Sequence, residues 1–259
     1  MLRIRLMGHQ NLPARVSATK NPRNPMTTSP QSREPQYQFL VERGAQGDTA
    51  QFGLMSSQTW QDDPKRLAFL LSRYKFASKM FSGCRRVLEV GCADAFGTRI
   101  MRQAVPEVVA ADFDPVFIAN AQAVMDPRWP VEFAVHDMTA GPLDRGVFDA
   151  AYALDVIEHI PSSAEDAFVC NIVASLRPHG VLLLGCPSQA SQAHASKPSR
   201  EGHVNCKDGE GMRDLLGRHF YNVFLFSMND EVVHTGFFPM AQYILGLACS
   251  PRGGAGTGA

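Results

Sequence analysis

The sequence predicts an α/β protein built on a doubly wound parallel sheet. Three observations favour this class: apolar strand-like runs alternate with helical segments, the first strand ends in a turn of small residues, and two strand-like segments close the chain. With 259 residues, 45% of them hydrophobic and 19% charged, the chain can bury a core of this size without disulfides or a structural metal.

The elements follow one another at the spacing of repeated strand–helix units. Residues 180–187 form a continuous apolar run, which is typical of a strand buried on both faces of the sheet. Asp114 and Pro115 predict the start of a helix, because aspartate caps helices and proline favours their first turn. The predicted strands are 85–90, 107–113, 131–137, 148–155, 180–187, 221–228 and 237–250, and the predicted helices among them are 98–105, 115–125, 163–176 and 206–219.

A helix is predicted at 62–81, ahead of the sheet, because leucines recur there at helical intervals. The segment 51–63 before it can close over a site as a lid, or its Met55 and Trp60 can pack in the core. The charged residues of the helix, such as Arg73, either face solvent or meet an anionic acceptor.

The two ends of the chain differ in composition from its middle. The first 36 residues are rich in proline and carry no acidic residue before Glu34, so this segment is predicted to be disordered. Its arginine-rich composition is compatible with an organellar transit peptide, but prolines oppose the amphipathic helix of such peptides, and we favour an over-extended start with Met26 as the initiator. The predicted organisation is a disordered extension at 1–36, a domain at 37–250 with cap helices at 37–83 and a core at 84–250, and a flexible tail at 251–259.

The balance of charges, the length of the apolar runs and the spacing of the cysteines limit the kinds of partner and compartment that we expect. Lysine plus arginine and aspartate plus glutamate both number 25, a balance that argues against a broad nucleic-acid interface. No window approaches the roughly 18 consecutive apolar residues of a membrane span, so no membrane partner is expected. The six cysteines are scattered without a paired motif, which is typical of reduced thiols in a cytoplasmic protein.

The turn after the first strand lies in VLEVGCADAFGT, residues 87–98. Gly91 and Gly97 keep this turn thin, so that a ligand can approach its backbone. Ala93 and Ala95 stand where such turns commonly carry glycine, and their methyl groups are tolerated if their backbone is right-handed or extended. Because pyrophosphate must approach the amides of this turn closely, the alanines favour a ligand without phosphate; a tight turn with no ligand is the alternative.

Acidic residues end the next two predicted strands. Asp112 lies about 20 residues after Gly91, the spacing at which a carboxylate accepts hydrogen bonds from the ribose hydroxyls of an adenosine ligand. Asp137 can accept a hydrogen bond from an adenine amino group while Met138 lies against the ring. The alternative for Asp137 is a simple turn at the end of its strand.

These segments, together with VVAADFDP, FAVHDM, FDAAYALDVIEHIP and LRPHGVLLLGCP, resemble the class I S-adenosylmethionine-dependent methyltransferases in order and spacing, over about residues 85–190. The resemblance implies a seven-stranded, mostly parallel sheet with an antiparallel last strand, which suits the two closing strands. It also implies S-adenosylmethionine as the cofactor, with its methionine and ribose at the first turn, its ribose on Asp112 and its methyl group beside Asp155. The cofactor contacts that it implies are Glu89, Gly91, Cys92, Ala93, Gly97, Asp112, Phe113, Asp137, Met138, Leu154 and Asp155.

Catalytic candidates follow the fourth and fifth strands. Glu158 and His159 stand in ALDVIEHIP at the methyl side, and His203 can return over the same mouth. Methyl transfer to a hydroxyl requires an aligned acceptor whose proton is removed, and histidine titrates near neutrality, so His159 or His203 is preferred to Glu158 as the base. Glu158 and His159 can instead be structural.

The same pattern is similar to two metal-using branches of the family, the ubiquinone-pathway O-methyltransferases and the small-RNA 3′-end methyltransferases. This resemblance implies a divalent ion at these residues as an alternative to a histidine base, and no metal ligand is assigned. The expected function is methyl transfer to a small-molecule acceptor, most readily at a hydroxyl oxygen. A nucleotide-dependent oxidoreductase and a non-catalytic protein with a vestigial cofactor site are the alternatives.

Overall fold

The computed structural model describes residues 30–252. The chain divides into two compact units, Met1–Thr49 and Ala50–Ala259. The described residues of the first unit form the short 3-10 helix η1 (Pro35–Tyr37) and helix α1 (Gln38–Ala45). The predicted extension at 1–36 and tail at 251–259 lie largely outside the described residues.

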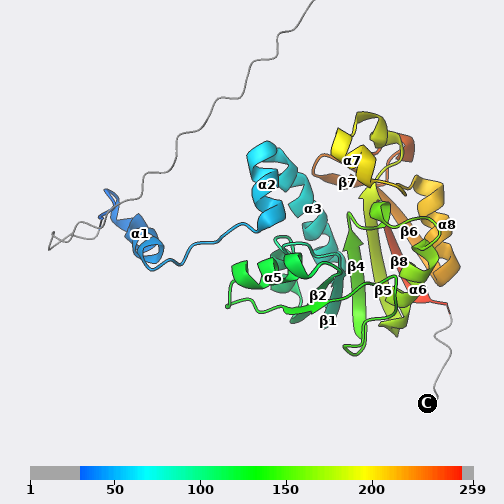
Figure 1. Ribbon diagram of the computed structural model, residues 1–259, viewed down its shortest axis with the longest axis horizontal. Coiled ribbons are helices and arrows are strands. Elements are labelled where there is room, and N and C mark those ends of the chain that lie inside the picture. Colours follow the sequence, from blue (N-terminus) through cyan, green and yellow to red (C-terminus); the bar gives the residue numbers. More distant parts are fainter. Residues whose placement is uncertain (1–29, 253–259) are drawn as a thin grey trace, which may run out of the picture. The chain divides into compact units, whose positions relative to one another are not determined.

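The second unit is built on one eight-stranded sheet with the order β3-β2-β1-β4-β5-β8-β6-β7 (Figure 1). Its strands are β1 (Arg86–Val90), β2 (Glu107–Asp112), β3 (Glu132–Val135), β4 (Phe148–Leu154), β5 (Leu176–Pro187), β6 (Phe220–Asn229), β7 (Val232–His234) and β8 (Tyr243–Pro251). Strands β1 to β5 pair in parallel, and β8 runs antiparallel to both β5 and β6. The predicted class and its antiparallel last strand are confirmed. The eighth strand is β7, which comes from the polar connection between the two closing strands.

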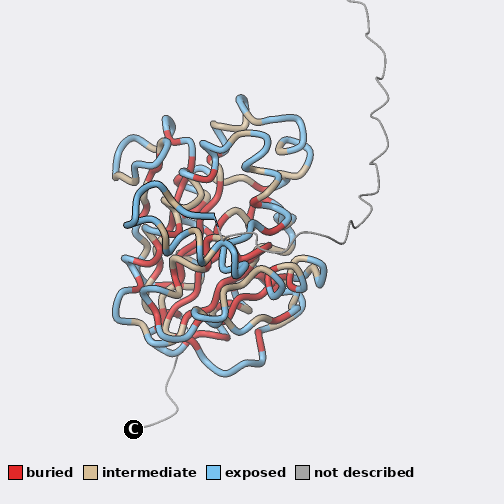
Figure 2. Tube along the Cα trace, turned by 90° about the vertical axis from the view of Figure 1, so that its left-hand side faces the viewer, coloured by how far each residue is buried: buried red, intermediate tan, exposed pale blue. Residues whose placement is uncertain are grey.

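Helices cover both faces of this sheet (Figure 1). They are α2 (Leu54–Asp62), α3 (Lys65–Met80), α4 (Thr98–Ala104), α5 (Pro115–Val124), α6 (Glu165–Ala174), α7 (Lys197–Gly202) and α8 (Gly209–His219). On one face Tyr74 of α3 and Met101 of α4 pack with Val87, and on the other Ile172 of α6 and Leu215 of α8 join a second buried cluster. Strands β1, β2 and β4 are therefore buried between the helices of the two faces. Figure 2 shows the buried segments in the interior of the unit and the exposed ones around them.

The carboxyl ends of the parallel strands meet at one edge of the sheet, where the loops after β1, β2, β4 and β5 begin. In sheets of this kind ligands bind at that edge. The segment 51–63, for which the sequence predicts a lid or core packing, contains helix α2, and together with α3 it forms the cap, Leu54–Met80. Within residues 30–252, no helix has the length and apolar character needed to cross a membrane.

Candidate active site

The loop after β1 begins at Gly91, where only glycine fits. Its φ is +77°, and a Cβ built there would lie 2.3 Å from a methyl carbon of Val156. The amides of Gly91 and Cys92 donate to the carbonyl of Ala111, at 2.8 and 3.1 Å, so the loop is fastened to β2 from its first residue. The small residue that the sequence predicts here is therefore required by close packing as well as by conformation.

The two loop alanines do not meet the condition under which their methyl groups are easily tolerated. Ala93 and Ala95 have φ values of +47° and +57°, in the left-handed region, instead of the right-handed or extended one. This conformation costs an alanine roughly 1–2 kcal/mol. Hydrogen bonds hold it in place: the Ala93 amide donates to Asp112 Oδ2 at 2.9 Å, and the Ala95 amide to the Cys92 carbonyl at 2.8 Å. The loop thus keeps the shape that glycines would favour.

Asp112 ends β2 beside this loop, and the residue is 7% exposed. Besides Ala93, its Oδ1 accepts from the amide of Asp114 at 3.0 Å. The next residue, Phe113, is 72% exposed, and Asp114 caps α5 through the amide of Val116, as the sequence predicts. Asp112 therefore joins the loop after β1 to the start of α5.

The residues after β3 are placed differently from one another. Asp137 is exposed, and its Oδ1 accepts from the amide and hydroxyl of Thr139 at 2.8 and 2.7 Å. These bonds hold the pKa of Asp137 below its usual range. Met138 is buried in the core, and its carbonyl accepts from Asn171 at 2.8 Å. Asp137 thus forms a turn at the strand end, which is the alternative that the sequence left open.

Glu89 lies beneath the loop, fully buried in β1. Its carboxylate accepts from the hydroxyls of Tyr74 and Thr98, at 2.8 and 2.5 Å. Burial raises the pKa of Glu89 to about 7, although these two hydrogen bonds oppose the shift. The ring of Tyr74 also covers Gly97, where a Cβ would lie 2.3 Å from a ring carbon. Helix α3 is therefore in direct contact with the loop.

The cap is also fastened to the loop through α2. Asp94 accepts from the amide of Ser56 at 2.7 Å and from its hydroxyl at 3.0 Å, and Asn120 accepts from the amide of Leu54 at 2.8 Å. Trp60 is 53% exposed and Met55 is 49% exposed, so neither packs in the core. Met55 instead faces the cavity described next.

A cavity of about 440 Å³, here called the main cavity, opens between the cap, the loop after β1, the turn after β4 and the segment after β5. It brings together residues that the sequence predicted separately. The predicted residues that line it are Gly91, Cys92, Ala93, Gly97, Leu154, Asp155, Glu158, His159 and His203. Glu89, Asp112, Phe113, Asp137 and Met138 lie outside its lining.

Asp155 is paired with Arg73, a partner that the sequence does not predict for it. Arg73 Nη1 lies 2.7 and 2.6 Å from the two carboxylate oxygens of Asp155, and the guanidinium stacks 3.7 Å from the ring centroid of Tyr243. The hydroxyl of Tyr243 in turn accepts from the Asp155 amide at 3.1 Å. Arg73 is thus neither a solvated charge nor a free group awaiting an anionic acceptor.

Glu158, His159 and His203 form a cluster of possible metal-binding or basic side chains in the main cavity. One ligand atom from each residue lies within 4.8 Å of the others. Glu158 is 1% exposed, and neither of its carboxylate oxygens has a hydrogen-bond partner among residues 30–252. Burial, and then the charge of Asp155, raise the pKa of Glu158 well above its usual range. Burial, and then the nearby His159, lower the pKa of His203 below its usual value, which favours the neutral imidazole.

The segment after β5, read from the sequence as a flap or a plain loop, is partly helical and carries His203 to this place. It contains the 3-10 helix η3 (Ala190–His194) and α7. The carbonyl of Glu158 accepts from the amides of Val204 and Asn205 at 2.8 and 3.0 Å. Asn205 donates to Glu165 at 2.9 Å, and Lys207 pairs with the same carboxylate. Glu165 is the first residue of α6 and lies within the helix predicted at 163–176, but the spacing of that helix does not show that Glu165 holds this distant segment.

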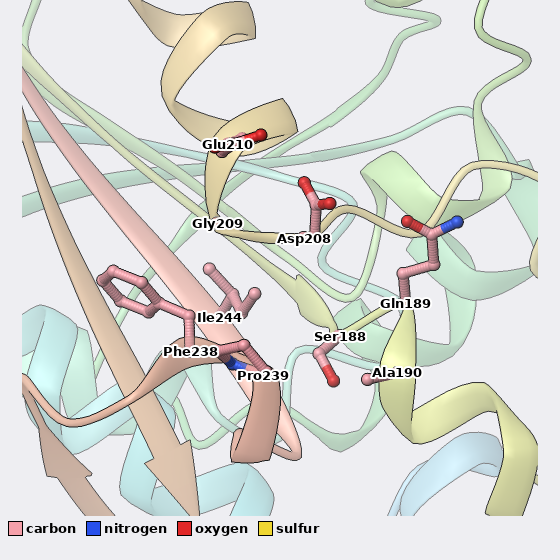
Figure 3. A pocket seen from close by; sticks show the side chains of 9 residues that line it. All are labelled: Ser188, Gln189, Ala190, Asp208, Gly209, Glu210, Phe238, Pro239 and Ile244. Carbon is pink, nitrogen blue, oxygen red and sulfur yellow. The ribbon is translucent and has the colours of Figure 1, made fainter.

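A second cavity of about 520 Å³ lies beyond the same segment (Figure 3). Phe238, Pro239 and Ile244 form an apolar wall, and Asp208 and Glu210 stand near the start of α8. Residues 188–190 line this second cavity, whereas Ser191 and Gln192 line the main cavity. The start of η3 therefore separates the two spaces.

Residues 87–180 match the family model described as a methyltransferase domain, and the sheet order and the loop after β1 agree with that match. The chain carries a class I S-adenosylmethionine-dependent methyltransferase domain. The matched part of this domain contains Asp112, Glu158 and His159, whereas Arg73 and His203 lie outside it.

Curated relatives and solved structures extend this methyltransferase assignment. A probable S-adenosylmethionine-dependent methyltransferase of Mycolicibacterium smegmatis is 30% identical over 122 residues, which are 47% of this chain and 44% of that protein. One of Mycobacterium tuberculosis strain H37Rv is 28% identical over 122 residues, 47% of this chain and 41% of that protein. The match thus spans less than half the length of these relatives.

Two solved structures share the fold of the methyltransferase domain. The N-methyltransferase NodS of Bradyrhizobium japonicum WM9 has a TM-score of 0.52 and 20% identity, covering 74% of this chain and 99% of that one. The methyltransferase domain of bacterial CtHen1-C has a TM-score of 0.60 and 12% identity, covering 71% of this chain and 100% of that one. At these identities the likeness concerns the fold.

Proposed function

We propose that the protein transfers a methyl group from S-adenosylmethionine to a hydroxyl oxygen of a small-molecule acceptor. The observation that carries the proposal is the main cavity, which joins the loop after β1 to the Glu158–His159–His203 cluster in one space. A cofactor at the loop and an acceptor at the cluster would then lie side by side. Proximity of this kind is a principal source of rate acceleration in transfer reactions.

The residues around the loop fit an adenosyl cofactor without phosphate. When bound, S-adenosylmethionine supplies a methyl group on a positively charged sulfonium, whose departure as a neutral thioether needs no acid. Gly91, Ala93 and Gly97 line the main cavity and would contact the cofactor, and the carboxylate of Asp112 would accept from the ribose hydroxyls. The methyl group of Ala93 would oppose the close approach of a pyrophosphate.

The two walls of the main cavity suit an acceptor with an apolar body and a hydroxyl group. Met55, Phe69 and Leu70 of the cap line one part of it, while His159 and His203 line another. The apolar wall would bind the body of the acceptor by excluding water. The histidines would receive its hydroxyl group and remove the proton as the oxygen attacks the methyl carbon.

A specific observation favours a divalent cation at this cluster as the second form of the mechanism. The two carboxylate oxygens of Glu158 are buried and receive no hydrogen bond from any residue between 30 and 252, an arrangement that is costly for the ionised form unless a cation compensates it. Glu158, His159 and His203 would hold the ion, and a set of one carboxylate and two imidazoles suits manganese, iron, cobalt or zinc better than magnesium. When bound, the ion would lower the pKa of a hydroxyl group that it contacts.

The cofactor part is tested by calorimetry with S-adenosylmethionine. Asp112→Asn should weaken binding by at least about tenfold, because one acceptor oxygen is replaced by a donor while the shape is retained. Asp114→Asn, a matched change at the cap of α5, should leave the affinity within about twofold. Unchanged affinity in Asp112→Asn, or the absence of binding to the wild-type protein, would contradict the proposal.

The acceptor part is tested by release of S-adenosylhomocysteine over a panel of phenols, catechols and sugars. If a chelator stops the reaction and manganese restores it, the cluster holds a metal. If the reaction survives the chelator and His203→Ala abolishes it, His203 acts as the base. Transfer to amines with no transfer to any hydroxyl would overturn the choice of oxygen.

A further inference from the structure

The imidazole of His203 is held by a side chain from η3. His203 Nδ1 lies 3.0 Å from Oε1 of Gln192, and both residues line the main cavity. The backbone of the same residue is also fixed, because its amide donates to the carbonyl of Ser199 at 2.8 Å. Both the ring and the backbone of His203 are therefore restrained, in a segment that the sequence predicts only as a flap or a plain loop.

The surroundings of Gln192 determine which of its amide atoms faces the ring. The amide nitrogen of Gln192 lies 3.5 Å from the carbonyl of Ser188 and 3.5 Å from the hydroxyl oxygen of Ser191. The carbonyl can only accept, so the nitrogen belongs on that side and the oxygen faces His203. An amide oxygen can only accept as well, which requires that Nδ1 of His203 carries the proton.

His159 is arranged in the same way by a different group. Its Nδ1 lies 3.0 Å from the carbonyl oxygen of Gly202, the residue before His203. That oxygen also only accepts, so Nδ1 is again the protonated nitrogen of the neutral ring. The two rings lie 5.1 Å apart at an interplanar angle of 74°. Each neutral ring is then left with its lone pair on Nε2.

We infer that Gln192 is a positioning residue that selects the Nδ1–H tautomer of His203 and thereby leaves the Nε2 lone pair available in the main cavity. This inference rests on the proposed function, in which His203 serves as a base or as a metal ligand. Both roles need an unprotonated ring nitrogen, because a nitrogen that carries a proton can neither accept another nor bind a metal. Gln192 would act through His203.

The inference is tested first by the tautomer itself. In protein with ¹⁵N-labelled histidine at pH 8, NMR should show the proton of His203 on Nδ1, with the signal assigned by its loss in His203→Ala. Gln192→Leu should shift His203 toward a mixture of tautomers, because the acceptor is gone. Gln192→Glu should preserve the wild-type tautomer, because a carboxylate also accepts from Nδ1. Gln189→Leu is the matched control, since Gln189 is exposed and lines the second cavity (Figure 3).

The second readout is the affinity of the protein for Mn²⁺, measured by competition with a fluorescent chelator. Gln192→Leu should weaken it by about 10- to 100-fold, the usual effect of removing the partner of a ligating histidine, and Gln192→Glu should restore it. A wild-type His203 with its proton on Nε2, or an unchanged tautomer in Gln192→Leu, would overturn the inference. A wild-type protein that has the expected tautomer but neither binds Mn²⁺ nor transfers a methyl group would overturn the proposed function and leave the role of Gln192 standing.

Discussion

Arg73 and Asp155 form an ion pair that joins helix α3 of the cap to the turn after β4, with Arg73 Nη1 contacting both carboxylate oxygens of Asp155. Their side chains are 17% and 29% exposed, so the pair is only partly reached by water. Asp155 also has a φ of +59°, which few residues other than glycine, asparagine and aspartate adopt readily. The pair therefore helps to hold the left-handed backbone of Asp155, a residue that lines the main cavity.

Removing the cation of this pair should destabilise the protein. Arg73→Met is expected to lower the free energy of unfolding by about 2 kcal/mol, because the carboxylate of Asp155 stays partly buried without its partner. A double-mutant cycle with Asp155→Asn, measured by urea denaturation, should give a coupling energy of about 1–3 kcal/mol. Arg66→Met, an exposed residue of the same helix, is the control and should change stability by about 0.5 kcal/mol or less. A coupling energy near zero would show that the pair does not hold the cap.

Glycine should be favoured at Ala93. Ala93→Gly relieves a left-handed alanine and should raise the free energy of unfolding by up to about 1 kcal/mol. Ala95→Gly should be nearly neutral, because Ala95 also packs in a buried cluster with Ile118 and its methyl group contributes about 0.8 kcal/mol there. Ala121→Gly, inside helix α5, should cost about 1 kcal/mol. Chemical denaturation distinguishes these three outcomes, and a destabilised Ala93→Gly would contradict the first.

The buried carboxyl of Glu89 should make stability depend on pH. Its pKa rises from 4.5 to about 7 in the folded protein, so between these values only the unfolded chain releases the proton. The free energy of unfolding should consequently fall as the pH rises through this window, by up to roughly 3 kcal/mol from this group. In Glu89→Gln this part of the slope should vanish, whereas the exposed Glu107→Gln should keep it. Urea midpoints from pH 4.5 to 8 provide the measurement, and parallel curves for Glu89→Gln and the wild type would refute the assignment.

Asp94 should control the opening of α2. Asp94→Ala removes the acceptor of the Ser56 amide and hydroxyl at the start of this helix, which typically costs about 1 kcal/mol. Hydrogen exchange of residues 54–62 should then become faster, while exchange in α6 stays unchanged. Asp63→Ala is a useful comparison, because Asp63 accepts from the first amide of α3 and should accelerate exchange there instead. Equal protection of α2 in Asp94→Ala and the wild type would show that the cap is held elsewhere.

The sequence predicts the features that depend on neighbouring residues. Apolar runs and helical spacing place the strands and helices to within a few residues, because side-chain periodicity is a local signal. The loop after β1 and the residues after β4 are likewise foreseen from short motifs. The left-handed backbone of Ala93 is not, because it is held by the carboxylate of Asp112, whose hydrogen bond to this loop cannot be read from spacing.

The contacts that complete the main cavity join residues far apart in the chain. Arg73 and Asp155 are 82 positions apart, and Asn205 and Glu165 are 40 apart. No periodicity relates such residues, and each pair forms only after the sheet has brought their segments together. The contact between Gln192 and His203 joins residues 11 positions apart, and no helical or strand periodicity relates them either.

The contact between Tyr74 and Gly97 has a consequence for how this chain can vary. Any side chain at position 97 would collide with the aromatic ring, so a substitution there becomes acceptable only after position 74 has shrunk. Yet a smaller residue at 74 would also withdraw the hydroxyl that reaches Glu89. Substitutions at positions 74, 89 and 97 therefore depend on one another, and homologous chains should change these residues jointly.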